Sequence, residues 1–110
     1  MQEALLILCT CPDEAVAARL ARALVDGRLA ACVNVLPGIR SIYRWQEKTE
    51  EENEVLLLIK TMTKQLAAVE AWLQANHPYD VPEIVALPAR HVNRSYLEWL
   101  TSQVSAPADR

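Results

Sequence analysis

A continuous apolar run, Val55-Leu56-Leu57-Leu58-Ile59, constrains the fold of this chain more than any other segment. A strand with one face in water alternates apolar and polar residues, whereas a strand that is apolar throughout has both faces covered. The chain has 110 residues, which is the size of one ordinary domain. We therefore expect a single domain over residues 1–110, with 105–110 as a frayed tail and with its central strand covered on both sides.

The segments around this run predict the element order β-α-β-β-α-β-α. Pro37-Gly38 is a turn signal between two extended segments, and the polar, acidic residues 46–53 indicate the loop of a long hairpin. Pro82 and Pro88 place the ends of the last strand at an edge or outside the ladder. The expected strands cover residues 4–10, 29–36 with its continuation 39–45, 54–60 and 81–87.

Three helices are predicted between and after these strands. The first helix begins with a cap at Thr10 or Cys11, and we expect Gly27 to end it in the left-handed conformation. The second helix must end before Pro78, because the residue before a proline disfavours helical geometry. Asn93 caps the third helix.

This order predicts an α+β fold of the ferredoxin-like type. Two split β-α-β units joined by a hairpin form an antiparallel sheet with helices on one face. The second face of such a sheet stays open, yet the strands of this chain are apolar on both sides. An exposed apolar face of roughly several hundred Å² marks an interaction site or a liability. We therefore expect a homo-oligomer in which further copies cover the open face.

Composition and charge exclude several classes of protein. Hydrophobic residues make up 52% of the chain and charged residues 23%, which excludes disorder outside the tail. No apolar stretch approaches the ~20 residues that span a membrane. The net charge is −3 and the basic residues are scattered, which argues against nucleic acid as a ligand. Three cysteines, an odd number, and an N-terminus without a basic leader favour the reducing cytoplasm.

Motifs of enzymatic catalysis are absent from the sequence. With only two glycines, the chain has no glycine-rich phosphate loop. No serine lies in a Gly-x-Ser-x-Gly elbow, and no local signature places a cysteine beside a histidine. We therefore expect a protein that binds a ligand and is not an enzyme.

Cys9-Thr10-Cys11 and two histidines are the candidate metal ligands. Residues two apart on a strand project to the same side, so both sulfurs could meet one soft ion such as Cu(I) or Zn(II). They supply half of a zinc site, which needs about four ligands. Core packing is the other interpretation, and the one favoured for Cys32. His77 is interpreted either as an exposed cap of the second helix or as an imidazole ligand, and His91 has no obvious partner.

Charged and aromatic residues outline a candidate pocket. Glu83 lies in a buried-looking strand and needs a partner, which Lys60 or an arginine could supply as a structural ion pair. The acidic residues between 47 and 54 are interpreted as a solvated hairpin tip. Aromatic rings often line small-molecule clefts and interfaces. The other interpretation of Glu83 is therefore a polar pocket between subunits, formed by Tyr43, Trp45, Lys60, Glu83, Tyr96 and Trp99.

Motifs along nearly the whole chain follow the order of one known family. The most specific of them is His77-Pro78-Tyr79-Asp80-Val81-Pro82-Glu83-Ile84. The other matching segments are Leu8 to Glu14, Leu29 to Asn34, Pro37-Gly38-Ile39, Ser41 to Trp45, Glu54, Ile59-Lys60-Thr61, Ala86-Leu87-Pro88, Tyr96-Leu97 and Trp99-Leu100. Together these motifs resemble the CutA-like divalent-cation tolerance proteins.

The resemblance implies a ferredoxin-like protomer in a tight homotrimer, similar in architecture to the PII signalling proteins. It also implies a role in tolerance of divalent metals, copper above all, with Cys9 and His77 as copper ligands. Some members have a second histidine where this chain has Asn76. The leading hypothesis is a cytoplasmic homotrimer that binds copper in the response to excess divalent metal. The alternatives are a PII-like sensor with a small ligand between subunits and a stable trimeric scaffold for partner proteins.

Overall fold

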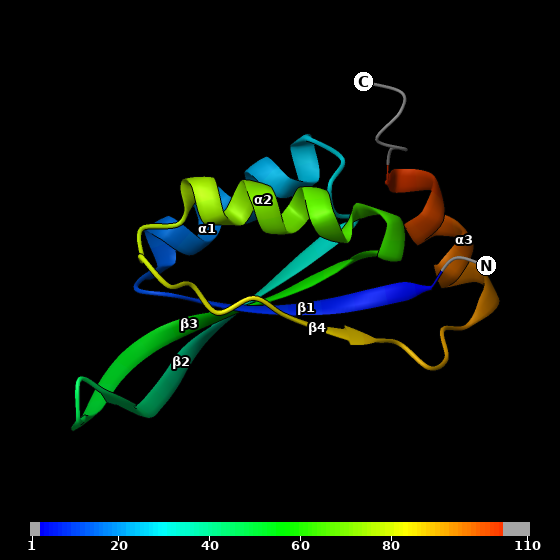
Figure 1. The fold of residues 1–110 in the computed structure, drawn as a ribbon. Helices are drawn as coiled ribbons and strands as arrows, with labels where there is room; N and C mark the ends of the chain where they lie inside the picture. Colours follow the sequence, from blue (N-terminus) through cyan, green and yellow to red (C-terminus); the bar gives the residue numbers. More distant parts are fainter. Residues whose placement is uncertain (1–2, 105–110) are drawn as a thin grey trace.

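The computed structural model describes residues 3–104, which form one four-stranded sheet and three α-helices (Figure 1). The elements in chain order are β1 (Ala4–Cys11), α1 (Glu14–Asp26), β2 (Cys32–Trp45), β3 (Lys48–Met62), a 3₁₀ turn (Thr63–Gln65), α2 (Leu66–Asn76), β4 (Val85–Pro88) and α3 (Arg94–Gln103). This order confirms the predicted α+β class. The expected tail, 105–110, lies outside the described residues. No helix within residues 3–104 is long and apolar enough to cross a membrane.

The sheet is antiparallel throughout, with the strand order β2-β3-β1-β4. Helices α1 and α2 lie side by side over one face, here called the inner face (Figure 1). The central strands β1 and β3 supply most of its core, where Ile7 lies opposite Ile59 and Cys9 opposite Leu57. The helices contribute buried side chains at helical spacing: Ala17, Leu20 and Leu24 from α1, and Val69 and Leu73 from α2. The predicted sheet with helices on one face is therefore present.

Both ends of α1 differ from the prediction. Cys11 is still paired with β3, so the cap falls two residues later, at Asp13, whose carboxylate accepts a hydrogen bond of 2.8 Å from the Val16 N–H. Gly27 has a φ of −82° and is not left-handed; that conformation belongs to Arg28, with a φ of 60°. The absence of a side chain at Gly27 avoids a close contact instead, because a Cβ there would lie 3.1 Å from the carbonyl oxygen of Ala23.

The predicted hairpin loop over 46–53 is wrong. Only Gln46 and Glu47 turn, with φ values of 50° and 65°, and β3 begins at Lys48. A two-residue turn with positive φ at both positions matches the twist of the flanking strands, so the ladder continues to its tip. The acidic side chains of this region therefore lie on a ribbon of β2 and β3, which projects from the body as an arm (Figure 1).

Two further strand boundaries also differ from the prediction. Pro37-Gly38 is a bulge inside one 14-residue strand, at which Gly38 adopts a φ of 82°. The last strand is confined to Val85–Pro88, so residues 81–84 precede the ladder. Pro82 has no N–H to donate, which is consistent with this later start.

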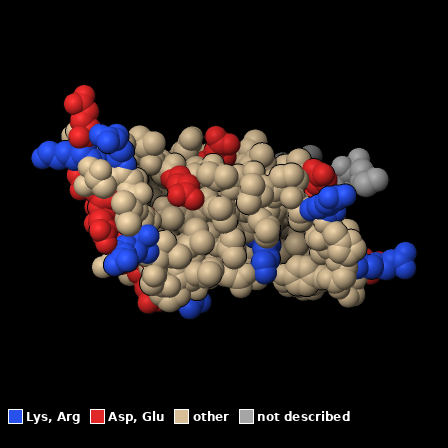
Figure 2. Space-filling view, turned by 90° about the horizontal axis from the view of Figure 1, so that it is seen from below, with Lys and Arg blue, Asp and Glu red and all other residues tan. Residues whose placement is uncertain are grey.

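The second face of the sheet, here called the outer face, is covered by the chain itself only at one end. There, Leu100 and Val104 pack with Ala4 and Met62. The rest of this face carries the alternate side chains of the strands, which are mostly apolar: Leu6, Leu8, Leu36, Leu56, Leu58, Val85 and Leu87. Figure 2 shows this side of the molecule, which is largely uncharged through its centre. The predicted apolar face without cover is present in the protomer.

Candidate metal centre

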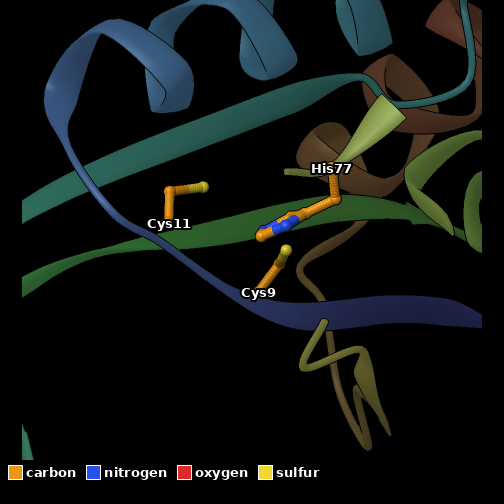
Figure 3. Close-up of side chains that lie close together, drawn as sticks. All are labelled: Cys9, Cys11 and His77. Atoms are coloured by element: carbon orange, nitrogen blue, oxygen red, sulfur yellow. The ribbon is translucent and has the colours of Figure 1, made fainter. Parts of the chain in front are cut away.

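Three potential metal ligands meet inside the molecule, between β1 and the end of α2. One ligand atom from each of Cys9, Cys11 and His77 lies within 4.8 Å of the other two (Figure 3). The two cysteines have no exposed surface, and His77 is 8% exposed. The structure therefore brings together Cys9 and His77, the ligands that the family resemblance implies, and places Cys11, the other candidate of the Cys9-Thr10-Cys11 motif, beside them.

The strand geometry of β1 explains the position of the two sulfurs. Cys9 and Cys11 are two residues apart, so both project to the inner face, where they lie opposite Leu57 and Val55 of β3. Both are free thiols. The prediction that they share one side is confirmed by this pairing. The third cysteine, Cys32, is also a free thiol but is paired with Lys60 on the outer face.

His77 is buried, which corrects the prediction of an exposed helix cap. It follows α2 directly, and its own N–H donates to the Leu73 carbonyl as the last bond of the helix. The ring is turned toward β1, where Nε2 lies 2.8 Å from the carbonyl oxygen of Thr10. Sequence spacing shows that His77 ends a helix, but not that this end lies against β1.

The hydrogen bonds of His77 define its protonation. The Tyr79 N–H donates to Nδ1 over 3.1 Å, so Nδ1 is the unprotonated nitrogen. Nε2 then carries the proton and donates it to the Thr10 oxygen. The ring is therefore a neutral imidazole, the form that binds metals. Since both nitrogens already have partners, a metal ion must take the place of one of these two hydrogen bonds.

The two thiols influence each other. The hydrogen bond with Cys11, together with burial, raises the pKa of Cys9 far above its ordinary value. The same hydrogen bond from Cys9 stabilises the thiolate of Cys11 and lowers the pKa of Cys11, against the opposing effect of burial. Thiolates are the form in which cysteine binds metal.

Glu54 and Tyr79 support the cluster and were missed by the sequence analysis. Glu54 was assigned to the solvated hairpin tip, yet it is only 8% exposed and accepts a hydrogen bond of 2.7 Å from the Tyr79 hydroxyl. Burial and this carboxylate raise the pKa of Tyr79 well above its usual range. Tyr79 in turn holds the His77 ring through its N–H, and the two rings lie 4.8 Å apart. The position of Glu54 next to the apolar run was the available signal.

The six residues of the predicted pocket do not meet within one chain. At the end of the outer face near α3, the Lys60 ammonium lies 5.8 Å from the Tyr96 ring centroid, and the Tyr96 and Trp99 rings lie 5.4 Å apart. Tyr43 and Trp45 lie on the arm, at the opposite end of the molecule (Figure 1). A pocket that contains both groups requires more than one chain.

The prediction that Glu83 lies in a buried strand is wrong. The residue is exposed and precedes β4, so it is not a buried strand residue in need of a partner. Within the described part of the chain, the ion pair that the structure records joins Arg40 and Glu51 on the arm. His91 is exposed in the segment before α3.

Comparison with known proteins extends these observations. A sequence model of the family described as CutA1 divalent ion tolerance protein matches residues 5–103. The divalent-cation tolerance protein CutA of Thermus thermophilus is 54% identical over 94 residues, which cover 86% of this chain and 91% of that protein. That of Pectobacterium atrosepticum is 47% identical over 102 residues, 93% of each chain. The crystal structure of CutA1 from Oryza sativa matches with a TM-score of 0.91 at 42% identity and 94% coverage of both chains. The similarity thus covers both sequence and fold.

Proposed function

The chain belongs to the CutA1 divalent ion tolerance family, and on that premise we propose that it is a cytoplasmic homotrimer that binds copper through Cys9 and His77. Family membership places it in divalent metal-ion tolerance. The observation that carries the proposal is the meeting of a thiol and an imidazole, both buried, between β1 and the end of α2. The role is binding, not catalysis.

The donor set favours copper among the metals of a tolerance response. Thiolate sulfur and imidazole nitrogen are soft to intermediate ligands, which suit copper, whereas hard ions such as Mg²⁺ and Ca²⁺ take carboxylate and carbonyl oxygen. Cys9 supplies the sulfur and His77 the nitrogen, and the ring nitrogen that does not bind copper keeps its hydrogen bond to the Thr10 carbonyl or from the Tyr79 N–H. Copper bound here would be shielded from water by the helices. Unpaired cysteines of this kind are kept reduced in a cytoplasm.

The outer face supports the homotrimer. Val85 and Leu87 keep 45% and 46% of their surface exposed in the single chain, beside the leucines of β1 and β3. Such a face is stabilised when a partner covers it, and closed symmetric homo-oligomers are the commonest solution. We include in this proposal that the trimer is similar in architecture to the PII signalling proteins. In such a trimer the open faces of the three sheets meet at the centre of the assembly.

Lys60 and its aromatic neighbours favour a second candidate function, the binding of a small regulatory ligand. The ammonium of Lys60, together with Tyr96 and Trp99, lies at the margin of the outer face, where the proposed subunits meet. A cation beside a pair of aromatic rings suits an anionic ligand with a flat group. A ligand-dependent rise in melting temperature that survives the loss of Cys9 and His77 would support this second function.

The experiment for the copper proposal is a calorimetric titration of the reduced, full-length protein with Cu(II) and, without oxygen, with Cu(I). The wild type is expected to saturate at a fixed ratio per chain, and Cys9→Ser and His77→Ala are expected to lose that binding. Weak binding that both substitutions leave unchanged would contradict the proposal. Light scattering on the same samples gives the number of chains in the assembly.

A further inference from the structure

We propose that Cys11 is a third copper ligand, so that the centre is a Cu(I) site with two sulfurs and one nitrogen. The inference rests on the proposed function, because it assigns an additional ligand to the same site. The spacing of Cys9 and Cys11 left core packing as the other interpretation, and the family resemblance gave ligand roles to Cys9 and His77 but not to Cys11. The geometric basis is that one ligand atom from Cys11 lies within 4.8 Å of those of both Cys9 and His77.

The burial of Cys11 is the first reason to regard it as a ligand and not as a residue that lies near the site by chance. Its side chain has no exposed surface and projects from β1 to the same side as that of Cys9 (Figure 3). A soft cation held by Cys9 and His77 alone would leave a second sulfur beside it, unbound and away from water. A thiol in that position is a better ligand for a soft cation than any water that would have to enter the core.

The hydrogen bonds of His77 give a second reason for the third ligand. Copper can reach a ring nitrogen only by replacing the bond to the Thr10 oxygen or the bond from the Tyr79 N–H. The loss of either bond opposes binding, because it leaves a buried polar group without its partner. A second sulfur–copper bond, formed by Cys11, offsets this cost with a residue that is already in place.

The number and type of the donor atoms favour one oxidation state of copper, Cu(I). Zinc in a structural site takes four ligands, but the cluster contains three His, Cys, Asp or Glu donors among residues 3–104, and all of them are buried. Cu(I) accepts low coordination numbers and prefers sulfur, whereas Cu(II) prefers nitrogen and oxygen in a square-planar arrangement. Two thiolates and one imidazole therefore suit Cu(I).

Binding then involves no change of oxidation state. Copper enters as Cu(I), and the Cys9 and Cys11 thiols each release a proton to solvent as their sulfur–copper bonds form. His77 stays neutral and contributes a nitrogen lone pair. The electrons and the protons balance without an added oxidant or reductant, provided that the metal is supplied as Cu(I).

The test is an oxygen-free competition titration of reduced full-length protein with Cu(I) against a chromophoric Cu(I) chelator. Cys11→Ala is expected to weaken Cu(I) binding by at least about 100-fold, since the loss of outer-shell partners alone costs 10–100-fold. Cys32→Ala is the matched control, because Cys32 is also a free thiol but lies on the outer face. It is expected to bind Cu(I) as the wild type does.

The outcomes separate the two proposals. If Cys11→Ala and Cys32→Ala both keep wild-type affinity while Cys9→Ala loses it, Cys11 is not a ligand and the proposed function stands. If the wild type and every variant bind Cu(I) equally weakly, both proposals are wrong.

X-ray absorption at the copper edge of the wild-type complex needs no variant. It shows whether copper has one or two sulfur ligands even if Cys11→Ala does not fold. A first shell of two sulfurs and one nitrogen is expected. A shell with a single sulfur would overturn the inference.

Discussion

The inner and outer faces of the sheet are built from the same four strands but are covered in different ways. On the inner face, Ile7 and Leu57 have no exposed surface beneath α1 and α2. On the outer face, α3 covers one end, and Val85 and Leu87 remain nearly half exposed. One face is covered within the chain, whereas most of the other is left open by the chain itself.

This difference assigns separate roles to the two faces. The soft donors Cys9, Cys11 and His77 are enclosed on the inner face, so a single chain supplies the whole donor set. The outer face has no such cluster among the described residues, but it has the apolar surface that assembly requires. Metal binding and assembly are therefore expected to respond to different substitutions.

The largest effect is expected for Leu57→Asp on the inner face. A carboxylate at this fully buried position has no partner, and we expect a loss of about 3–5 kcal/mol in the free energy of unfolding. This is much of the stability of an ordinary domain. Circular dichroism and urea unfolding measure it, with Glu51→Ala on the exposed arm as a nearly silent control. A soluble Leu57→Asp protein with a wild-type unfolding midpoint would show that Leu57 is not buried between the sheet and the helices.

The next effect is a loss of assembly without unfolding, from Leu87→Glu on the outer face. Leu87 is 46% exposed in the single chain, so the fold tolerates a charge there, but an interface that buries it does not. Light scattering is expected to show the mass of one chain in place of three, with unchanged circular dichroism. Val25→Glu, at an exposed apolar position on α1, is the control and should leave the assembly intact. An unchanged mass for Leu87→Glu would exclude this face as the interface.

A smaller effect is expected for Tyr79→Phe, which tests the support of the metal centre. The substitution removes the hydroxyl that donates to Glu54 and leaves a buried carboxylate without this partner. We expect a loss of about 1–3 kcal/mol in the free energy of unfolding, measured with urea. Tyr43→Phe removes an exposed hydroxyl beside Glu52 and should be nearly silent. Equal midpoints for the two variants would mean that the Glu54 contact contributes nothing.

The parts of the fold that depend on local pattern could be predicted from the sequence. The apolar run at Val55–Ile59 predicts a central strand, and the i, i+2 spacing of Cys9 and Cys11 predicts that their side chains share a face. The turn at Gln46-Glu47 could not be predicted in this way, because neither residue carries the usual Asn-Gly or Asp-Gly signal for positive φ.

The parts that depend on tertiary contacts were missed or misjudged. His77 looks like an exposed helix cap because nothing in its neighbourhood shows that α2 ends against β1. Glu54 looks like part of an acidic run, and its burial follows from Tyr79, which lies 25 residues further along the chain. The spacing of the cysteines and the family resemblance therefore pointed to the donors, but not to the residues that hold them in place.

The most direct test of the separation between the two faces is anomalous diffraction at the copper edge from crystals of the Cu(I)-loaded wild type. The account predicts one peak per chain, on the inner face between Cys9, Cys11 and His77, and no peak where subunits meet. A peak confined to the outer face or to the boundary between subunits would contradict it, because metal binding and assembly would then share one surface.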